Sequence, residues 1–198
     1  MEKQLHSKLE INLLLVFSFL YVAFFLLNAV LHGNFEFFYY AIIVVALILF
    51  VNINYEKFHL SKSVLFGLAL LGFFHLLGGS WYLGGIRLYD HYFWIFKYDN
   101  FVHFFGGFVM LLISYSMLSP YFKIIKNKRP FAFAFILVIF TLGAGAVIEL
   151  VELLAVIFMN AGPKVGDYMN NAFDIVFNLL GATAASFVAY FYRKKETK

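Results

Sequence analysis

Two acidic residues, Glu149 and Glu152, interrupt an apolar run from Phe131 to Met159 that is long enough to cross a lipid bilayer. A charged side chain at the bilayer centre costs roughly 2.5 to 3.5 kcal/mol on insertion scales, so such residues usually face a bundle interior or a watery cavity. The two glutamates are three positions apart and therefore share one helical face. We predict that this face lines a functional site.

Acidic and imidazole side chains recur in three further apolar stretches. Asp99 and His103 are four positions apart near the start of one stretch, and Asp174 and Asn178 are four positions apart near the start of another. Residues four apart lie on one helical face, so each pair presents its polar groups to the same side. The third stretch carries His75. We expect four helices to direct these groups into one pocket.

The chemistry that these groups could perform is metal binding or proton transfer. Two ionised glutamates about 6 Å apart repel by about 3 kcal/mol at an effective dielectric near 20, so a cation or proton should lie near them. Imidazole and carboxylate suit zinc, iron or manganese, although the Glu-x-x-His spacing of dimetal bundles is absent. The candidate catalytic residues are Glu149, Glu152 and His103. The candidate site-lining residues are His75, Asp99, Asp167, Asp174 and Asn178. The candidate ligands of a divalent metal cofactor are His75, His103, Glu149, Glu152 and Asp174.

Each candidate also has a purely structural interpretation. Glu149 and Glu152 could be a protonated or hydrogen-bonded pair at a helix interface. Asp99 and Asp167 precede apolar runs and could cap the helices that follow them. His75 alone could be a satisfied core residue. The functional interpretation therefore depends on whether the side chains converge.

The composition places the chain among integral membrane proteins. Of its 198 residues, 63% are hydrophobic and only 13% are charged, and there is no cysteine for disulfide or thiol chemistry. The net charge of +4 comes from basic residues in short loops, which favours membrane topology over nucleic-acid binding. We detect no linker and no repeat period, and we expect residues 1–198 to form a single transmembrane domain.

The apolar runs predict an all-α polytopic fold with six transmembrane helices in one bundle. Pro120 falls where the fourth helix should end, and Pro130 falls where the fifth should begin. The first run lacks a cleavage site, so we interpret it as a retained helix rather than a signal peptide. The expected spans are residues 9–31, 35–53, 62–83, 101–119, 131–159 and 170–192.

The distribution of basic residues predicts the orientation. With a cytoplasmic N-terminus, twelve Lys and Arg residues fall in inside segments and three fall outside, which is a positive-inside pattern for a cell-membrane protein with both termini cytoplasmic. At about 1.5 Å per residue, Glu149 and His75 then lie in the outer half of the membrane. Asp99 and Asp174 begin inward-running helices at a similar depth. The aromatic connection between residues 84 and 100 should lie along the outer interface, where it could form a lid.

Four segments resemble the YjdF-like family of bacterial inner-membrane proteins. The stretch from Tyr98 to Phe108 matches the family order of Tyr-Asp, His-Phe and Gly-Phe, and residues 149–152 match its Glu-Leu-x-Glu helix. Residues 166–174 are similar to its Gly-Asp-x-Trp-Asp-x-x-x-Asp segment, except that Met169 replaces Trp and Asn170 replaces Asp. The upstream stretch from His75 resembles the family's His-x-x-Gly. A more distant similarity is to VanZ-like membrane proteins, associated with glycopeptide resistance. The resemblance implies six membrane helices and no established reaction.

Three functions are compatible with these patterns. The leading hypothesis is a metal- or proton-binding site that acts on a lipid-linked or envelope-derived substrate within the lipid bilayer. The second is a small transporter in which the same carboxylates bind a proton or cation. The third is a non-catalytic scaffold whose buried polar network fixes helix register.

Overall fold

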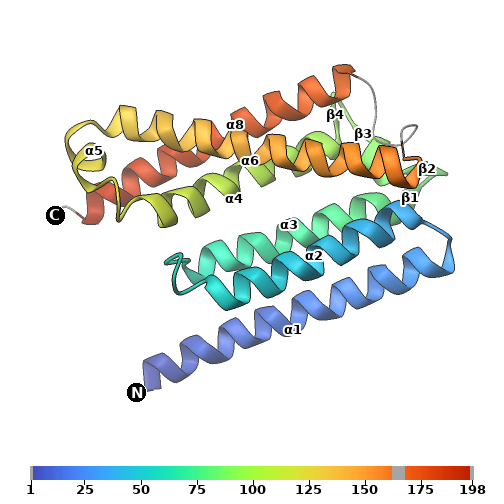
Figure 1. The fold of residues 1–198 in the computed structure, drawn as a ribbon, viewed down its shortest axis with the longest axis horizontal. Coiled ribbons are helices and arrows are strands. Elements are labelled where there is room, and N and C mark those ends of the chain that lie inside the picture. The colour runs from blue at the N-terminus through green and yellow to red at the C-terminus, as the bar shows by residue number, and fades with distance from the viewer. Residues whose placement is uncertain (1, 162–167, 197–198) are drawn as a thin grey trace. The chain divides into compact units, whose positions relative to one another are not determined.

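The fold consists of long helices joined by short connections and two pairs of two-residue strands (Figure 1). The computed structural model describes residues 2–161 and 168–196. Six of the described helices are long and apolar enough to cross a membrane, which confirms the predicted all-α polytopic fold. The described helices are α1 (Glu2–Leu31), α2 (Phe35–Asn54), α3 (Lys62–Ser80), α4 (Tyr98–Leu118), α5 (Lys123–Lys128), α6 (Pro130–Met159) and α8 (Tyr168–Glu196).

The helix boundaries differ from the predicted spans by a few residues. Pro130 is the first residue of α6, as its fixed φ favours. The third span was expected to reach Leu83, but α3 ends at Ser80 because the next residues pair as strands. The short helix α5 lies in the connection before Pro130 and has Lys126 and Lys128 in its last turn.

The chain forms two compact units, Met1–Tyr98 and Asp99–Lys198. In the first unit, α1, α2 and α3 pack together through aromatic rings. The Phe73 ring of α3 lies 5.7 Å from Tyr21 and 5.9 Å from Phe25 of α1, measured between ring centroids. At Gly79 an added Cβ would lie 1.7 Å from Phe37, so α3 requires glycine where this ring of α2 crosses it. The single transmembrane domain expected for residues 1–198 stays a prediction.

In the second unit, α4, α6 and α8 enclose a separate core. Its small residues Ala182, Ala185 and Ala189 on α8 are buried against large side chains of α4 and α6, which include Leu111 and Leu137. An added Cβ at Gly107 of α4 would lie 2.3 Å from the Asn178 carbonyl oxygen of α8, and one at Gly181 of α8 would lie 1.9 Å from the Phe104 carbonyl oxygen. Backbone contact of this kind is typical of membrane helices with small residues at their interface. It brings the polar faces of α4 and α8 together.

The connection between α3 and α4 folds as two β-hairpins separated by a single turn of 3₁₀ helix. The first hairpin pairs β1 (Tyr82–Leu83) with β2 (Ile86–Arg87), and the second pairs β3 (Tyr92–Phe93) with β4 (Phe96–Lys97). The turn η1 (Leu88–Asp90) joins them. Sequence analysis anticipated an interfacial segment here but not its hairpins.

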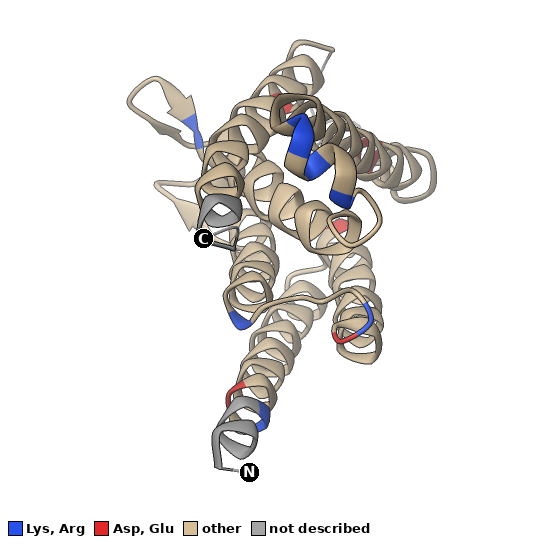
Figure 2. Cartoon of the chain, turned by 90° about the vertical axis from the view of Figure 1, so that its left-hand side faces the viewer, with Lys and Arg blue, Asp and Glu red and all other residues tan. Residues whose placement is uncertain are grey.

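Basic residues are concentrated at helix ends and in connections. Figure 2 shows the long helices tan over most of their length, with blue basic positions grouped in short segments. This distribution is expected for helices that cross the hydrocarbon core of a membrane, because burying a charged side chain in that core costs free energy.

Candidate functional site

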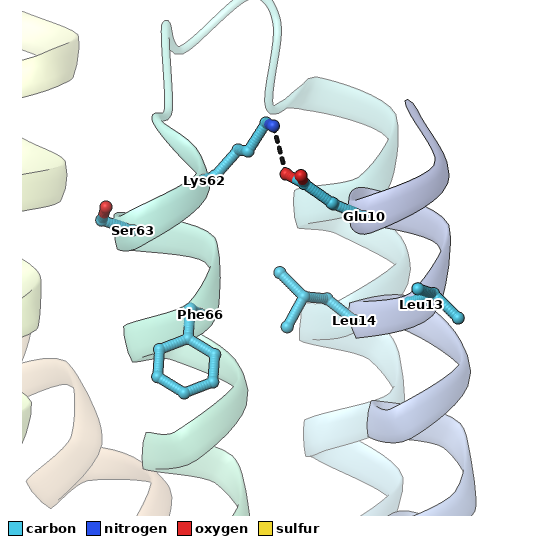
Figure 3. A pocket seen from close by; sticks show the side chains of 6 residues that line it. All are labelled: Glu10, Leu13, Leu14, Lys62, Ser63 and Phe66. Carbon is cyan, nitrogen blue, oxygen red and sulfur yellow. Dashed lines mark hydrogen bonds and ion pairs between the residues drawn. The ribbon is translucent and has the colours of Figure 1, made fainter. Parts of the chain in front are cut away.

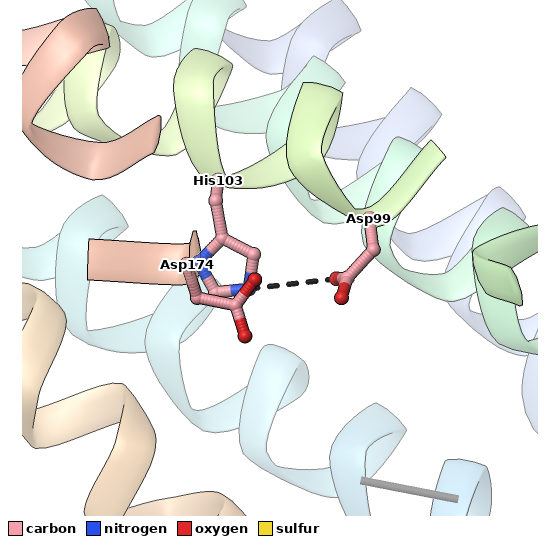
Figure 4. A group of neighbouring side chains, drawn as sticks. All are labelled: Asp99, His103 and Asp174. Carbon is pink, nitrogen blue, oxygen red and sulfur yellow. Dashed lines mark ion pairs between the residues drawn. The ribbon is translucent and has the colours of Figure 1, made fainter. Parts of the chain in front are cut away.

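The candidate site is built on the first turns of α4 and on the facing part of α8. One turn separates Asp99 from His103 on α4, and Asp174 projects from α8 towards the same ring (Figure 4). The His103 Nε2 atom lies 3.5 Å from Asp99 Oδ1 and 3.6 Å from Asp174 Oδ1. One imidazole nitrogen is therefore placed between two carboxylates from different helices.

Asn170 also connects the two carboxylates. Its Nδ2 amide donates to Asp99 Oδ2 at 3.3 Å and to Asp174 Oδ2 at 2.9 Å. Asn170 lies one helical turn before Asp174 on α8, and this spacing places both side chains on one face. Sequence analysis did not include Asn170 among the site residues, although its four-residue spacing from Asp174 was the signal that could have found it.

The three titratable side chains are largely removed from solvent. Side-chain exposure is 1% for Asp174, 11% for His103 and 15% for Asp99. Buried charges are strongly unfavourable unless they are paired, hydrogen-bonded or bound to a metal. The arrangement of one imidazole and one amide between two carboxylates supplies such partners.

The same arrangement has the donor set of a metal centre. One ligand-type atom from each of Asp99, His103 and Asp174 lies within 4.8 Å of the other two. Zinc bound by three protein ligands keeps a fourth position open for water or substrate in catalytic sites, and imidazole with carboxylate also suits manganese and iron. The residues present therefore fit a divalent cation.

Asn178 contacts the other nitrogen of the His103 ring and so controls its tautomer. The Asn178 Nδ2 atom lies 3.3 Å from His103 Nδ1. In this orientation the amide donates to Nδ1, and the ring proton then resides on Nε2 beside the carboxylates. If the Asn178 amide is instead rotated by 180°, its oxygen accepts a hydrogen bond from Nδ1–H of His103. The lone pair on Nε2 is then free to bind a metal. The site can therefore hold a proton or an ion at the same atom.

Helix α6 brings Glu149 and Glu152 towards this group. Both glutamates interact electrostatically with His103 and Asp99. Each Glu149 carboxylate oxygen is buried and accepts no hydrogen bond from the residues that the structure describes. One turn earlier, an added Cβ at Gly145 would lie 3.0 Å from the Asn178 amide nitrogen, so α6 is close to α8 here. Of the residues predicted for the site, the second unit thus brings together Glu149, Glu152, His103, Asp99, Asp174 and Asn178.

Two further predicted site residues, His75 and Asp167, stay predictions. His75 lies in the first unit, where its Nδ1 atom is 2.6 Å from the Tyr89 hydroxyl and its ring contacts Phe37 and Tyr40. These contacts pack the half-buried ring among aromatic side chains of the first unit. Asp167 lies outside the described residues.

A family model described as "Predicted membrane protein (DUF2238)" matches residues 13–195. The chain belongs to this family. The match covers all of the α4, α6 and α8 site residues. Searches of the curated proteins and of the solved structures find no match. The prediction of a membrane-protein family is confirmed, while the YjdF and VanZ names suggested by the sequence stay predictions.

The DUF2238 match also covers a second buried polar group, which sequence analysis missed. In the first unit, an Arg87 guanidinium nitrogen lies 3.7 Å from Glu36 Oε2, and Arg87 Nε donates to Asp90 Oδ2 at 2.8 Å. Burial lowers the pKa of Arg87, but the hydrogen bond and charge of Asp90 and the charge of Glu36 outweigh it and raise the pKa above its ordinary value. Arg87 therefore remains charged and ties the first hairpin to α2.

A groove lies between α1 and α3 in the first unit (Figure 3). Leu13, Leu14 and Phe66 line it, and an ion pair between Lys62 and Glu10 closes one end. Its lining is chiefly apolar and holds no cluster of metal ligands or nucleophiles. The groove therefore offers less chemistry than the α4–α8 group.

Proposed function

We propose that this DUF2238 membrane protein binds a divalent cation through Asp99, His103 and Asp174 and acts with it on a lipid-linked or envelope-derived substrate. The observation that carries the proposal is the mutual approach of three ligand-type atoms, from two helices, within 4.8 Å. A bound divalent ion can activate water at neutral pH and can polarise a phosphoryl or carbonyl oxygen. The positive-inside pattern supports a cell-membrane location with both termini cytoplasmic and the site in the outer half of the bilayer.

The excess of carboxylates in the site supports the binding of a cation. Asp99, Asp174, Glu149 and Glu152 contribute four carboxylates around one imidazole, and Asp174 is only 1% exposed. If all four were ionised, even a protonated His103 would offset only one of them. In a medium of low dielectric this excess is unfavourable, and either bound protons or a divalent ion would reduce it.

The remaining polar residues then have distinct roles. Glu149 and Glu152 stand on a third helix and are the candidates for a general base beside the ion. Asn170 holds the two aspartates through its amide. Asn178 sets the His103 tautomer by its contact with Nδ1. Such supporting hydrogen bonds commonly fix the orientation and basicity of metal ligands.

The test is the metal content of the purified full-length protein and three variants. His103→Ala and Asp174→Asn remove ligands, whereas Glu56→Gln removes one exposed carboxylate in the connection after α2 and serves as the matched control. We expect near-stoichiometric zinc or manganese in the unmodified protein and in Glu56→Gln, and at least a tenfold lower ratio in the two ligand variants. Helical circular dichroism and size-exclusion profiles verify that the variants are folded. Absence of metal from the unmodified protein after loading, or equal metal in all four proteins, would refute the proposal.

A proton- or cation-coupled transporter is the second candidate. It is favoured by Glu149, whose buried oxygens accept no hydrogen bond from the described residues and which interacts with His103. A carboxylate in this condition could exchange a proton during transport. Proteoliposome flux that disappears in Glu149→Gln but persists in Glu56→Gln would favour transport. Loss of thermal stability alone in the site variants would favour the scaffold function.

A further inference from the structure

The two hairpins between α3 and α4 are successive copies of one ten-residue unit. In the first, Tyr82 pairs with Arg87 and Leu83 with Ile86. In the second, an aromatic residue again pairs with a basic residue, since Tyr92 is opposite Lys97, and the apolar pair is Phe93 with Phe96. The backbone N–H after each hairpin donates to the carbonyl before it, at 2.8 Å and 3.1 Å. Both hairpins therefore have the same register and closure.

The copies differ at their tips. The first turn is Gly84–Gly85, with φ values of +58° and +83°, which glycine adopts readily. The second turn is Trp94–Ile95, and Trp94 has φ of +66°. A positive φ is unfavourable for a bulky residue. Such a residue is usually found there because its side chain serves a function that offsets the backbone strain. Trp94 is 92% exposed, so contacts within the chain do not provide that role.

The second hairpin has an exposed surface of large apolar and aromatic side chains. Ile95 is 63% exposed, and Tyr92, Phe93 and Phe96 are also exposed. The Lys97 ammonium lies 5.7 Å from the centre of the Tyr92 ring. Aromatic rings favour the membrane–water interface, and lysine can place its stem along apolar surface while its charge reaches water. The combination fits a lipid headgroup layer better than bulk water.

Chain connectivity keeps the hairpin near that layer. α3 ends at Ser80, and α4 begins at Tyr98, directly after β4, while both helices are long and apolar enough to span a membrane. Three extended residues reach about 10 Å from the start of α4 to the tip. The headgroup region adds roughly 5 to 8 Å on each side of the hydrocarbon core. The tip therefore cannot leave the neighbourhood of the membrane surface.

We infer that the second hairpin is inserted in the lipid interface, with Trp94 and Ile95 at the boundary between headgroups and acyl chains. The first hairpin is held on α2 by the pairing of Arg87 with Glu36. Contact of this hairpin with lipid does not depend on whether the α4–α8 site binds metal.

The chain offers a direct probe because it contains two tryptophans, Trp81 and Trp94. Trp81→Phe leaves Trp94 as the single tryptophan of the full-length protein, which is reconstituted in phosphatidylcholine vesicles. Acyl chains brominated near the headgroup or near the chain end, and iodide in the aqueous phase, then report its depth. We expect blue-shifted emission, at least twofold stronger quenching by the shallow bromolipid than by the deep one, and weak iodide quenching. The converse variant Trp94→Phe reports Trp81 at the end of α3 as the reference.

A second variant separates insertion from misfolding. Ile95→Ser on the Trp81→Phe background should shift Trp94 emission to longer wavelength and raise its iodide quenching at least twofold, while helical circular dichroism is unchanged. If Trp81→Phe does not fold, the spectrum of Trp94→Phe is subtracted from that of the unmodified protein to isolate Trp94. Strong iodide quenching of Trp94 without bromolipid quenching would overturn the inference, since the tip would then project into water.

Discussion

Gly181→Ala tests whether close contact between α4 and α8 assembles the site. The added Cβ would lie 1.9 Å from the Phe104 carbonyl oxygen, and an ordinary carbon–oxygen contact is about 3.3 Å. The backbones must therefore separate by roughly 1.4 Å, because a helix carbonyl cannot turn aside as a side chain can. His103 precedes Phe104 on α4, so the 3.6 Å distance from His103 Nε2 to Asp174 Oδ1 would widen by up to about 1.4 Å. Ligands of one zinc ion must each approach it to about 2.0 to 2.2 Å, so the wider separation works against binding.

We expect Gly181→Ala to lose most of its bound metal although every ligand remains. Overpacking of this kind should also lower the free energy of unfolding by about 1 to 3 kcal/mol. The matched control is Gly143→Ala on α6, where an added Cβ meets no atom within 4 Å. The assays are metal-to-protein ratio and thermal unfolding in detergent, with Gly143→Ala expected to bind as much metal as the unmodified protein and to be at least as stable, because alanine favours a helix interior over glycine. Full metal binding and full stability in Gly181→Ala would refute the α4–α8 packing on which the site depends.

Three further substitutions separate the roles of individual residues. Asn170→Ala removes the amide shared by Asp99 and Asp174 and should weaken metal binding by about 10- to 100-fold in a chelator competition; unchanged affinity would exclude a supporting role. Arg87→Ala leaves Glu36, which is 5% exposed, without its guanidinium partner and should destabilise the protein by about 3 to 5 kcal/mol in thermal unfolding. An unchanged melting temperature would contradict the ion pair. Glu149→Gln should keep or raise the melting temperature, because it removes a buried carboxylate whose oxygens accept no hydrogen bond from described residues; a large decrease would show that the carboxylate stabilises the fold.

The helices could be predicted because bilayer thickness imposes a strong length signal. An apolar run of about 20 residues is visible without any tertiary information, and Pro130 marked the start of α6 correctly. The hairpins could not be predicted in the same way. Strands of two residues are too short for an alternating pattern, and the positive φ of Trp94 contradicts its side-chain preference. The ten-residue repeat is apparent only once both registers are known.

The candidate site was partly accessible to sequence because helical spacing assigns residues to faces. Asp99 with His103, and Asp174 with Asn178, could be paired along each helix without coordinates. Rotation of one helix against another is decided by close packing at Gly107 and Gly181, which hydropathy does not encode. Depth alone grouped His75 with the site, and that assignment stays a prediction; within the first unit its ring contacts Phe37, Tyr40 and Tyr89.

The most direct test of the central claim is X-ray absorption spectroscopy of the zinc-loaded full-length protein. The cluster of Asp99, His103 and Asp174 predicts one nitrogen ligand at about 2.0 to 2.1 Å and oxygen ligands at about 2.0 to 2.2 Å. The imidazole scattering should disappear in His103→Ala and persist in Glu56→Gln. Zinc surrounded by oxygen alone in the unmodified protein, or an imidazole signal unchanged in His103→Ala, would contradict a metal centre between α4 and α8.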